Sequence, residues 1–283
     1  MPRGIVFILP LFFFLLALLL LSVLGDTNHH DQRIRSVGRK SKTCQKPHFV
    51  LVHGYGGGAW SWYKIWCLLE TSGYKVTCLD LKGAGIDSTD SSTVHTFDSY
   101  NEPLINFLAN LTENEKVILV GHSAGGLSVT DASQRFSKKI QVAIYVAAVM
   151  LKHGYVTDQD KKNGVPDFVL GDSNSTTGGN TSRPHITPQE DAVLASMLSR
   201  PVPLEAILEA RFRGNGAENV RRVYMKTMYD QVLKPEQQEA MIKKWPLAPS
   251  DVVVLKSDHY LPFSDPFVLS GSLVQVAASI ECN

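Results

Sequence analysis

Ser123 has the residue type and the surroundings of an acyl-transfer nucleophile. It lies in the run KVILVGHSAGG (residues 116–126), where an apolar stretch meets a turn made of small residues. The pattern G-x-S-x-G at a strand–helix junction is typical of a nucleophile elbow, whose tight turn exposes the serine hydroxyl at the end of the strand. An incidental serine in a glycine-rich turn is the alternative. The apolar strand before it and the small-residue helix start after it favour the catalytic interpretation.

A serine hydroxyl is a poor nucleophile at neutral pH, so it needs a base that a third group orients. Downstream of Ser123, the apolar run 223–226 is followed by Asp230, and the run 252–255 is followed by His259. The chain order Ser, Asp, His, with each residue after a strand, is that of α/β-hydrolases. Because open α/β sheets build their sites at the carboxyl ends of strands, we predict Asp230 as the orienting acid and His259 as the base.

Each of these two residues also has an ordinary structural interpretation. Asp230 could be an acid that flanks a helix, and Asp251 and Asp258 compete for its role. Asp258 is adjacent to His259, which makes a hydrogen bond to that ring hard to form. His259 could be a histidine of a surface loop. His122, next to the nucleophile, is expected to support the elbow rather than to act as the base.

The oxyanion of an acyl-transfer transition state needs hydrogen-bond donors. One is the backbone N–H after the nucleophile, that of Ala124, and the loop after the first strand supplies the other. We predict the N–H of Tyr55 for this second donor. Glycines at Gly54 and 56–58 could also indicate a phosphate-binding loop, but the loop has neither GxGxxG nor GK[ST].

Alternating apolar strands and amphipathic helices position these residues. The patterns predict strands over 48–53, 75–79, 116–120, 142–147, 223–226 and 252–255. They predict helices over 59–72, 97–110, 188–198 and 235–244, from the elbow to about 136, and near 204–211 and 266–279. This order predicts an α/β fold, in which a mostly parallel sheet has helices on both faces. An insertion over about 150–210, with the polar run DSNSTTGGNTS, interrupts the alternation.

Length and composition indicate one globular domain. The chain has 283 residues, 44% of them hydrophobic and 19% charged, and a formal net charge of +1. This balance does not favour nucleic acid as a partner. We predict a polar linker over 26–46 and a hydrolase domain over 47–283.

The N-terminus has the pattern of a targeting segment. A basic start precedes an apolar run over 5–24 that ends before Gly25, which predicts a secretory signal peptide over 1–25. The run is nearly long enough to span a bilayer, and basic residues follow it, so a signal anchor or an organelle-targeting segment is the alternative. Sequons at Asn110, Asn174 and Asn180 favour entry into the secretory pathway.

Four cysteines follow this segment. Cys67 in a predicted helix and Cys78 in a predicted strand are interpreted as free thiols, whereas Cys44 and Cys282 could be joined. The chain has no CxxC spacing, so we expect neither a metal nor a cofactor.

Several longer motifs point to one family. The runs FVLVHGYGGGAWSWYK, LKGAGID, SYNEPL, GHSAGG, RRVYMKT with its following aspartate, and SDHY resemble the plant methylesterase and α-hydroxynitrile lyase family of α/β-hydrolases. The resemblance covers nearly the whole chain after the linker. It implies a triad of Ser123, Asp230 and His259, an oxyanion hole from Tyr55 and Ala124, and a lid built from the insertion.

The resemblance favours the esterase branch, whose members hydrolyse methyl esters of small acids such as indole-acetate, jasmonate and salicylate. The lyase branch carries a threonine after the first-strand histidine and a lysine after the catalytic histidine. This chain has Gly54 and Tyr260 there. The insertion lacks an aromatic-rich stretch between about 179 and 188, so the lid is shorter than is usual in the family. A ligand-binding homologue of low activity is the alternative, and a hydroxynitrile lyase is the third interpretation.

Overall fold

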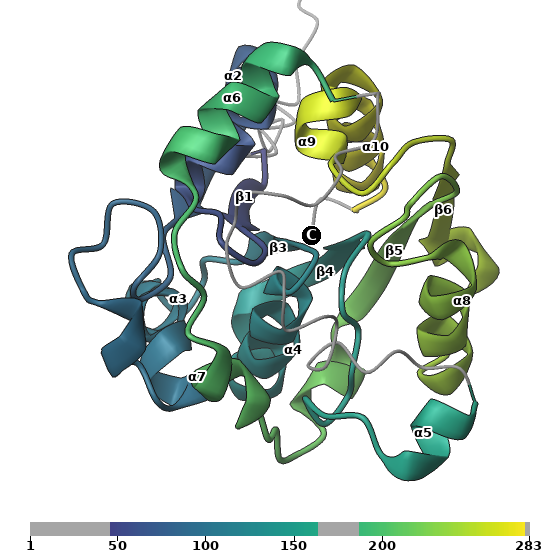
Figure 1. The fold of residues 1–283 in the computed structure, drawn as a ribbon. Helices are drawn as coiled ribbons and strands as arrows, with labels where there is room; N and C mark the ends of the chain where they lie inside the picture. Colours follow the sequence, from purple (N-terminus) through teal and green to yellow (C-terminus); the bar gives the residue numbers. More distant parts are fainter. Residues whose placement is uncertain (1–45, 164–186, 281–283) are drawn as a thin grey trace, which may run out of the picture. The chain divides into compact units, whose positions relative to one another are not determined.

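The computed structural model describes residues 46–163 and 187–280 (Figure 1). The predicted N-terminal segment, Cys44, Cys282 and the sequons at Asn174 and Asn180 lie outside the described residues. Within the described ranges, no helix is both long and apolar enough to cross a membrane.

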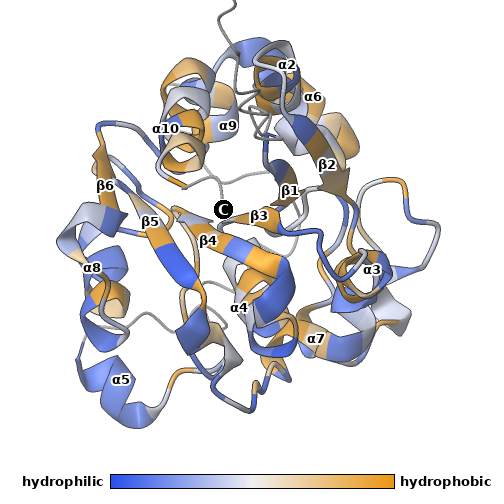
Figure 2. Ribbon diagram, turned by 180° about the vertical axis from the view of Figure 1, so that it is seen from behind, coloured by the Kyte–Doolittle hydropathy of each residue, from blue (hydrophilic) through white to orange (hydrophobic). Residues whose placement is uncertain are grey.

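A parallel sheet of six strands, in the order β2-β1-β3-β4-β5-β6, forms the centre of the domain. The predicted parallel α/β fold is therefore confirmed. Figure 2 shows hydrophobic residues along the central strands, as expected for strands that are covered on both faces. The strands are β1 (His48–Val52), β2 (Lys75–Leu79), β3 (Val117–His122), β4 (Ile140–Val146), β5 (Arg221–Thr227) and β6 (Val252–Leu255).

Helices cover both faces of the sheet because successive strand residues point to opposite sides. Phe49 and Leu51 of β1 pack in one core with α2 (Tyr63–Thr71), α9 (Leu261–Ser264) and α10 (Pro266–Ala278). Val50 and Val52 pack in the other core with the helices of the opposite face. Those helices are α3 (Phe97–Asn110), α4 (Gly125–Arg135), α7 (Leu204–Leu208) and α8 (Pro235–Lys244).

Most predicted elements are present, with corrections at their ends. The helix predicted over 59–72 begins as the 3-10 turn η1 (Ala59–Trp62), and the helix predicted near 204–211 ends at Leu208. The short helix α9 was not predicted, because four residues with a proline at the second position give no helical periodicity. The other 3-10 turns of the described ranges are η2 (Ser91–Thr93), η3 (Ser137–Lys139), η5 (Gly216–Asn219) and η6 (Pro249–Asp251).

The described part of the insertion contains three helices. After β4 comes α5 (Asp158–Lys162), and after the undescribed residues 164–186 come α6 (Gln189–Leu198) and α7. In Figure 1, α6 lies beside α2, and the Tyr63 hydroxyl of α2 donates a 2.7 Å hydrogen bond to Asp191 of α6.

Backbone hydrogen bonds continue past the ends of the strands, from the turn after β3 to the loop after β6. This row joins the segments that carry the three predicted catalytic residues. Its members are Ser123 N–Val146 O (3.2 Å), Ala147 N–Met225 O (3.0 Å), Met228 N–Leu255 O (2.9 Å) and Tyr229 N–Ser257 O (3.0 Å).

Candidate active site

The segment around Ser123 has the geometry expected of a nucleophile elbow. β3 ends at His122, α4 begins at Gly125, and Ser123 between them has a φ of +54°. Few residues other than glycine adopt this left-handed conformation, so the turn is strained. A Cβ atom on Gly121 would lie 2.7 Å from the Gly125 carbonyl oxygen, and one on Gly125 would lie 2.5 Å from the His53 carbonyl oxygen. Both flanking positions therefore require glycine.

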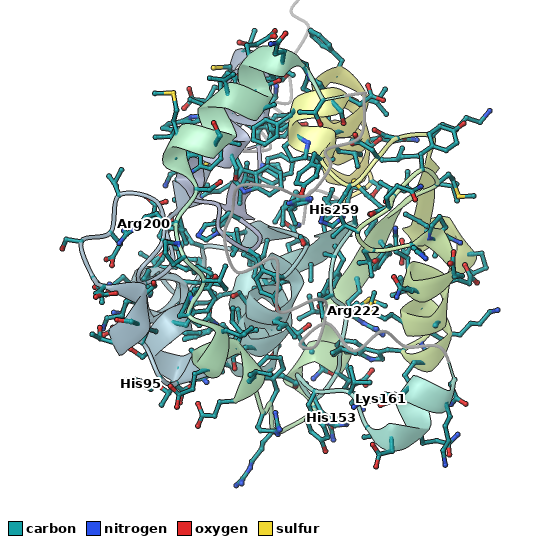
Figure 3. The ribbon with its side chains drawn as sticks, in the orientation of Figure 1. His95, His153, Lys161, Arg200, Arg222 and His259 are labelled. Atoms are coloured by element: carbon teal, nitrogen blue, oxygen red, sulfur yellow. The ribbon has the colours of Figure 1, made fainter. Side chains whose placement is uncertain are left out.

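The structure brings the three predicted residues into one hydrogen-bonded chain. His259 Nε2 lies 3.0 Å from Ser123 Oγ, and His259 Nδ1 lies 2.8 Å from Asp230 Oδ2. Asp230 is completely buried and His259 is 3% exposed. Figure 3 shows His259 between α9 and the strands. Because the Asp230 carboxylate accepts a hydrogen bond from His259 Nδ1, that nitrogen carries the ring proton. His259 Nε2 then presents its lone pair to the serine hydroxyl.

The two competing aspartates have other partners. Asp258 Oδ1 accepts hydrogen bonds from the Tyr260 N–H at 2.9 Å and from the Ser264 hydroxyl at 2.6 Å. Asp251 forms an ion pair with Arg221 at 2.7 Å. The geometry therefore favours Asp230 as the acid.

Asp230 is held by backbone and side-chain donors of its own loop. Its Oδ1 atom accepts from the N–H groups of Val232 (2.8 Å) and Leu233 (2.7 Å). Its Oδ2 atom accepts from the Thr227 hydroxyl at 3.0 Å in addition to His259. Hydrogen bonds of this kind stabilise a carboxylate that has been removed from water.

His122 supports the loop that carries His259. Its Nε2 atom donates a 2.7 Å hydrogen bond to the His259 carbonyl oxygen, and its ring lies 4.9 Å from the His259 ring and 6.2 Å from Trp62. Burial, together with the nearby His259, lowers the pKa of His122 to about 3. A neutral ring that donates at Nε2 agrees with the supporting role expected from the sequence.

The loop after β1 lies against Ser123, the predicted nucleophile. His53 Nδ1 donates to the Gly54 carbonyl oxygen at 2.8 Å, while His53 Nε2 accepts from the Leu81 N–H at 3.1 Å. Burial lowers the pKa of His53, which keeps this ring neutral. Because a trans peptide is planar, a fixed Gly54 carbonyl also fixes the opposite direction of the Tyr55 N–H.

A Cβ atom on Gly54 would lie 2.8 Å from Ser123 Cβ, so the Gly54–Tyr55 peptide is a close neighbour of Ser123. This placement suits the predicted pair of oxyanion donors, the N–H groups of Tyr55 and Ala124.

Comparisons with known proteins agree with this architecture. The family model described as the alpha/beta hydrolase fold matches residues 47–171. Methylesterase 17 of Arabidopsis thaliana is 50% identical over 258 residues, which cover 83% of this chain and 92% of the relative. The chain belongs to the plant methylesterase family of α/β-hydrolases.

Solved structures of this family superpose on most of the chain. The crystal structure of the Arabidopsis methylesterase MES16 covers 82% of this chain and 99% of its own, with a TM-score of 0.67 and 39% identity. Polyneuridine aldehyde esterase covers 82% of this chain and 100% of its own, with a TM-score of 0.71 and 32% identity. Like its family, this chain is a serine ester hydrolase.

In this methylesterase-family protein, the second part of the insertion contacts the loop after β1. The Arg200 N–H donates to the Gly56 carbonyl oxygen at 3.0 Å. The Arg200 guanidinium donates to the carbonyl oxygens of Thr89 (3.0 Å) and Asp87 in the loop after β2, and Figure 3 shows it beside that loop. The sequence did not predict this contact, since nothing local marks Arg200 as a partner of a segment so distant in the chain.

Two surface cavities of the methylesterase-family domain are lined by residues other than the triad. One, of about 270 Å³, lies between η2 and the segment 201–205, and the other, of about 160 Å³, lies between α8 and the segment 150–160. In the described ranges, no three His, Cys, Asp or Glu side chains gather as metal ligands would.

Proposed function

We propose that this protein hydrolyses methyl esters of small carboxylic acids, of the indole-acetate, jasmonate or salicylate type, by a Ser-His-Asp mechanism. The observation that carries the proposal is the chain of hydrogen bonds from Asp230 through His259 to Ser123, with distances of 2.8 and 3.0 Å. The relatives named methylesterases support the choice of a methyl ester.

In this mechanism, Ser123 Oγ attacks the ester carbonyl carbon while His259 Nε2 takes the hydroxyl proton. The N–H groups of Tyr55 and Ala124 stabilise the oxyanion of the tetrahedral intermediate. His259 then gives its proton to the leaving methoxy group, and methanol departs from the acyl-enzyme. A water molecule, deprotonated by His259, then attacks the acyl carbonyl carbon. His259 returns this proton to Ser123 Oγ as the bond between Oγ and the acyl carbon breaks, and the acid leaves. Asp230 holds the imidazole and stabilises its charged form.

Two residues favour hydrolysis over cyanohydrin cleavage. At Gly54, a threonine side chain would begin 2.8 Å from Ser123 Cβ, so the hydroxyl of the lyase branch has no room without movement of the loop. After His259, the position that carries a lysine in the lyase branch is Tyr260. The site therefore lacks the hydroxyl and the cation that a departing cyanide would use.

A panel of methyl esters, with p-nitrophenyl acetate as a general ester and mandelonitrile as a lyase substrate, tests the proposal. We expect release of acid from at least one methyl ester, its loss in Ser123→Ala, and no cyanide from mandelonitrile. A Ser123→Ala variant as active as the wild type would refute the mechanism. Ligand binding without turnover by the wild type would identify a ligand-binding homologue instead.

We also propose that residues 1–25 direct the chain into the secretory pathway. The exposed position of Asn110 at the end of α3 supports this, because a sequon there is open to glycosylation. N-terminal sequencing of the protein from a plant secretory host, with peptide N-glycosidase treatment, tests the proposal. We expect a chain that begins after Gly25 and loses mass on treatment; an intact N-terminus without glycan would contradict it.

A further inference from the structure

Gln238 is a completely buried polar residue of α8 that lies beside the acid of the triad. Its Nε2 atom is 3.3 Å from Asp230 Oδ2, the same oxygen that accepts from His259. We infer that Gln238, together with Thr227, is a positioning residue that holds Asp230 against His259 and disperses the charge of that carboxylate. This inference rests on the proposed roles of Asp230 and His259.

The neighbours of Gln238 fix the orientation of its amide. Its Oε1 atom accepts from the Thr227 N–H at 3.0 Å, and an N–H can only donate. Its Nε2 atom lies 2.6 Å from the Leu233 carbonyl oxygen, which can only accept. Both contacts would be lost if the amide were turned over, so Nε2 faces the carboxylate.

Gln238 also fixes the direction of the Thr227 hydroxyl. Nε2 donates to Thr227 Oγ1 at 2.9 Å, which leaves the single hydroxyl proton of Thr227 for Asp230 Oδ2 at 3.0 Å. Leu233 completes the arrangement, because its N–H donates to Asp230 Oδ1 while its carbonyl accepts from Gln238. One buried amide thus connects both ends of the loop that carries the acid.

These donors change how strongly Asp230 attracts the imidazolium of His259. A carboxylate that shares its charge with several donors is a weaker partner for a nearby cation than one with fewer donors. Removing the Thr227 hydroxyl, or the Gln238 amide that orients it, leaves more of the negative charge of Asp230 facing His259. Both changes should make His259 hold its proton to a higher pH.

The test uses Thr227→Val, which keeps the shape of the side chain but removes its donor, and Gln238→Met, which keeps the length of the side chain but removes its Nε2 donor. The readouts are the acidic limb of the pH profile of kcat/KM and an NMR titration of the His259 ring. We expect both midpoints to rise by about one pH unit. We also expect kcat to fall about tenfold while KM changes less than twofold. His122, Tyr260 and Tyr224, which face His259 and Asp230, are unchanged in both variants.

Two further variants separate positioning from a purely structural role. Thr227→Ser keeps the hydroxyl and should retain the wild-type midpoint. Gln237→Met alters the adjacent residue of α8, whose side chain accepts from the Lys234 N–H at 2.9 Å, so it should lower the Tm without moving the midpoint.

Folded Thr227→Val with a wild-type midpoint would overturn the inference, even if Gln238→Met failed to fold. The NMR titration needs no substrate, so a wild-type protein that cleaves no ester would refute the proposed function without deciding this test.

Discussion

The N–H of Arg200 donates a 3.0 Å hydrogen bond to the carbonyl oxygen of Gly56, next to the predicted oxyanion donor Tyr55. A Cβ atom on Gly56 would lie 3.3 Å from the Arg200 carbonyl oxygen, so the two backbones are in close contact. The segment that follows α6 thus forms one wall of the loop after β1. In this protein, the second part of the insertion belongs to the framework of the site.

Replacing Arg200 with alanine should lower kcat about tenfold, because the loop that holds Tyr55 loses a neighbour that is anchored to the loop after β2. Arg200→Lys should be intermediate, since an ammonium cannot reach the carbonyls of Asp87 and Thr89 with the fork of a guanidinium. Steady-state kinetics on the best methyl ester measure this effect. Arg211→Ala is the matched control, because within the described ranges its guanidinium donates to carbonyl oxygens at and just beyond the end of α7 and lies over the Tyr155 ring. Equal losses in the two alanine variants would contradict the prediction.

Gly54→Ala should reduce ester hydrolysis about a hundredfold, the cost of losing one oxyanion donor. The added Cβ would lie 2.8 Å from Ser123 Cβ and 3.2 Å from the His122 carbonyl oxygen, so the loop or the elbow must move. The rate of hydrolysis and the Tm are measured together. Gly271→Ala on α10 is the control, because nothing lies within 4 Å of its added Cβ. That variant should keep full activity, and its free energy of unfolding should rise by about 0.5–1 kcal/mol.

Asp191→Ala should lower the free energy of unfolding by about 3 kcal/mol. It breaks the ion pair between Asp191 Oδ2 and the Lys64 ammonium, whose N–O distance is 2.5 Å. Asp191 is completely buried, and Lys64 also donates to the Phe263 carbonyl oxygen of α9 at 3.3 Å. Urea unfolding followed by circular dichroism gives the change. Glu190→Ala, at an exposed position of the same helix, should stay within about 0.5 kcal/mol of the wild type. A similar small change in Asp191→Ala would show that α6 does not depend on this ion pair.

Stability should fall as the pH drops below about 6.5, where histidines of the unfolded chain become protonated. Burial lowers the pKa of His122 to about 3 and is the main reason that the pKa of His48 falls to about 4. At a pH between the pKa of a histidine in the folded protein and its pKa in the unfolded chain, the unfolded chain binds more protons. Lowering the pH therefore favours unfolding. For the buried His122, the free energy of unfolding falls by about 1.4 kcal/mol per pH unit.

Urea unfolding at pH 7.5, 6 and 5 measures this slope. His48→Gln keeps a partner for Thr77 Oγ1, which lies 2.8 Å from His48 Nε2, but removes one titrating group. Its slope should therefore be shallower than that of the wild type. An unchanged slope would show that His48 is not protonated on unfolding in this range.

The sequence was most informative where a residue type and its local chain neighbours decide the outcome. Buried parallel strands are continuous apolar runs, so β2 and β6 were predicted with the bounds that the structure has. The elbow was recognisable because a left-handed serine needs small residues on both sides. Asp230 and His259 could be placed because each follows a strand in a known order.

Contacts between distant segments could not be predicted in the same way. Arg200, Asp191 and Gln238 look like ordinary residues of a loop and two helices, and their roles depend on which segments pack together. Asp191 lies 128 positions from Tyr63, the side chain that binds it. Such contacts form only when the helices pack against the sheet, so no local sequence pattern predicts them.

The place of β6 at the edge of the sheet has a consequence for how this protein loses activity on heating. Ser123, the proposed nucleophile, follows the inner strand β3, whereas His259, the proposed base, follows β6 at one edge of the sheet. An edge strand has a partner on one side only, so local opening starts there at a lower free energy than global unfolding. Detachment of β6 would carry His259 away while Ser123 stayed in its turn. The protein would then lose activity at a lower temperature than that at which the whole domain unfolds, because β6 alone has detached.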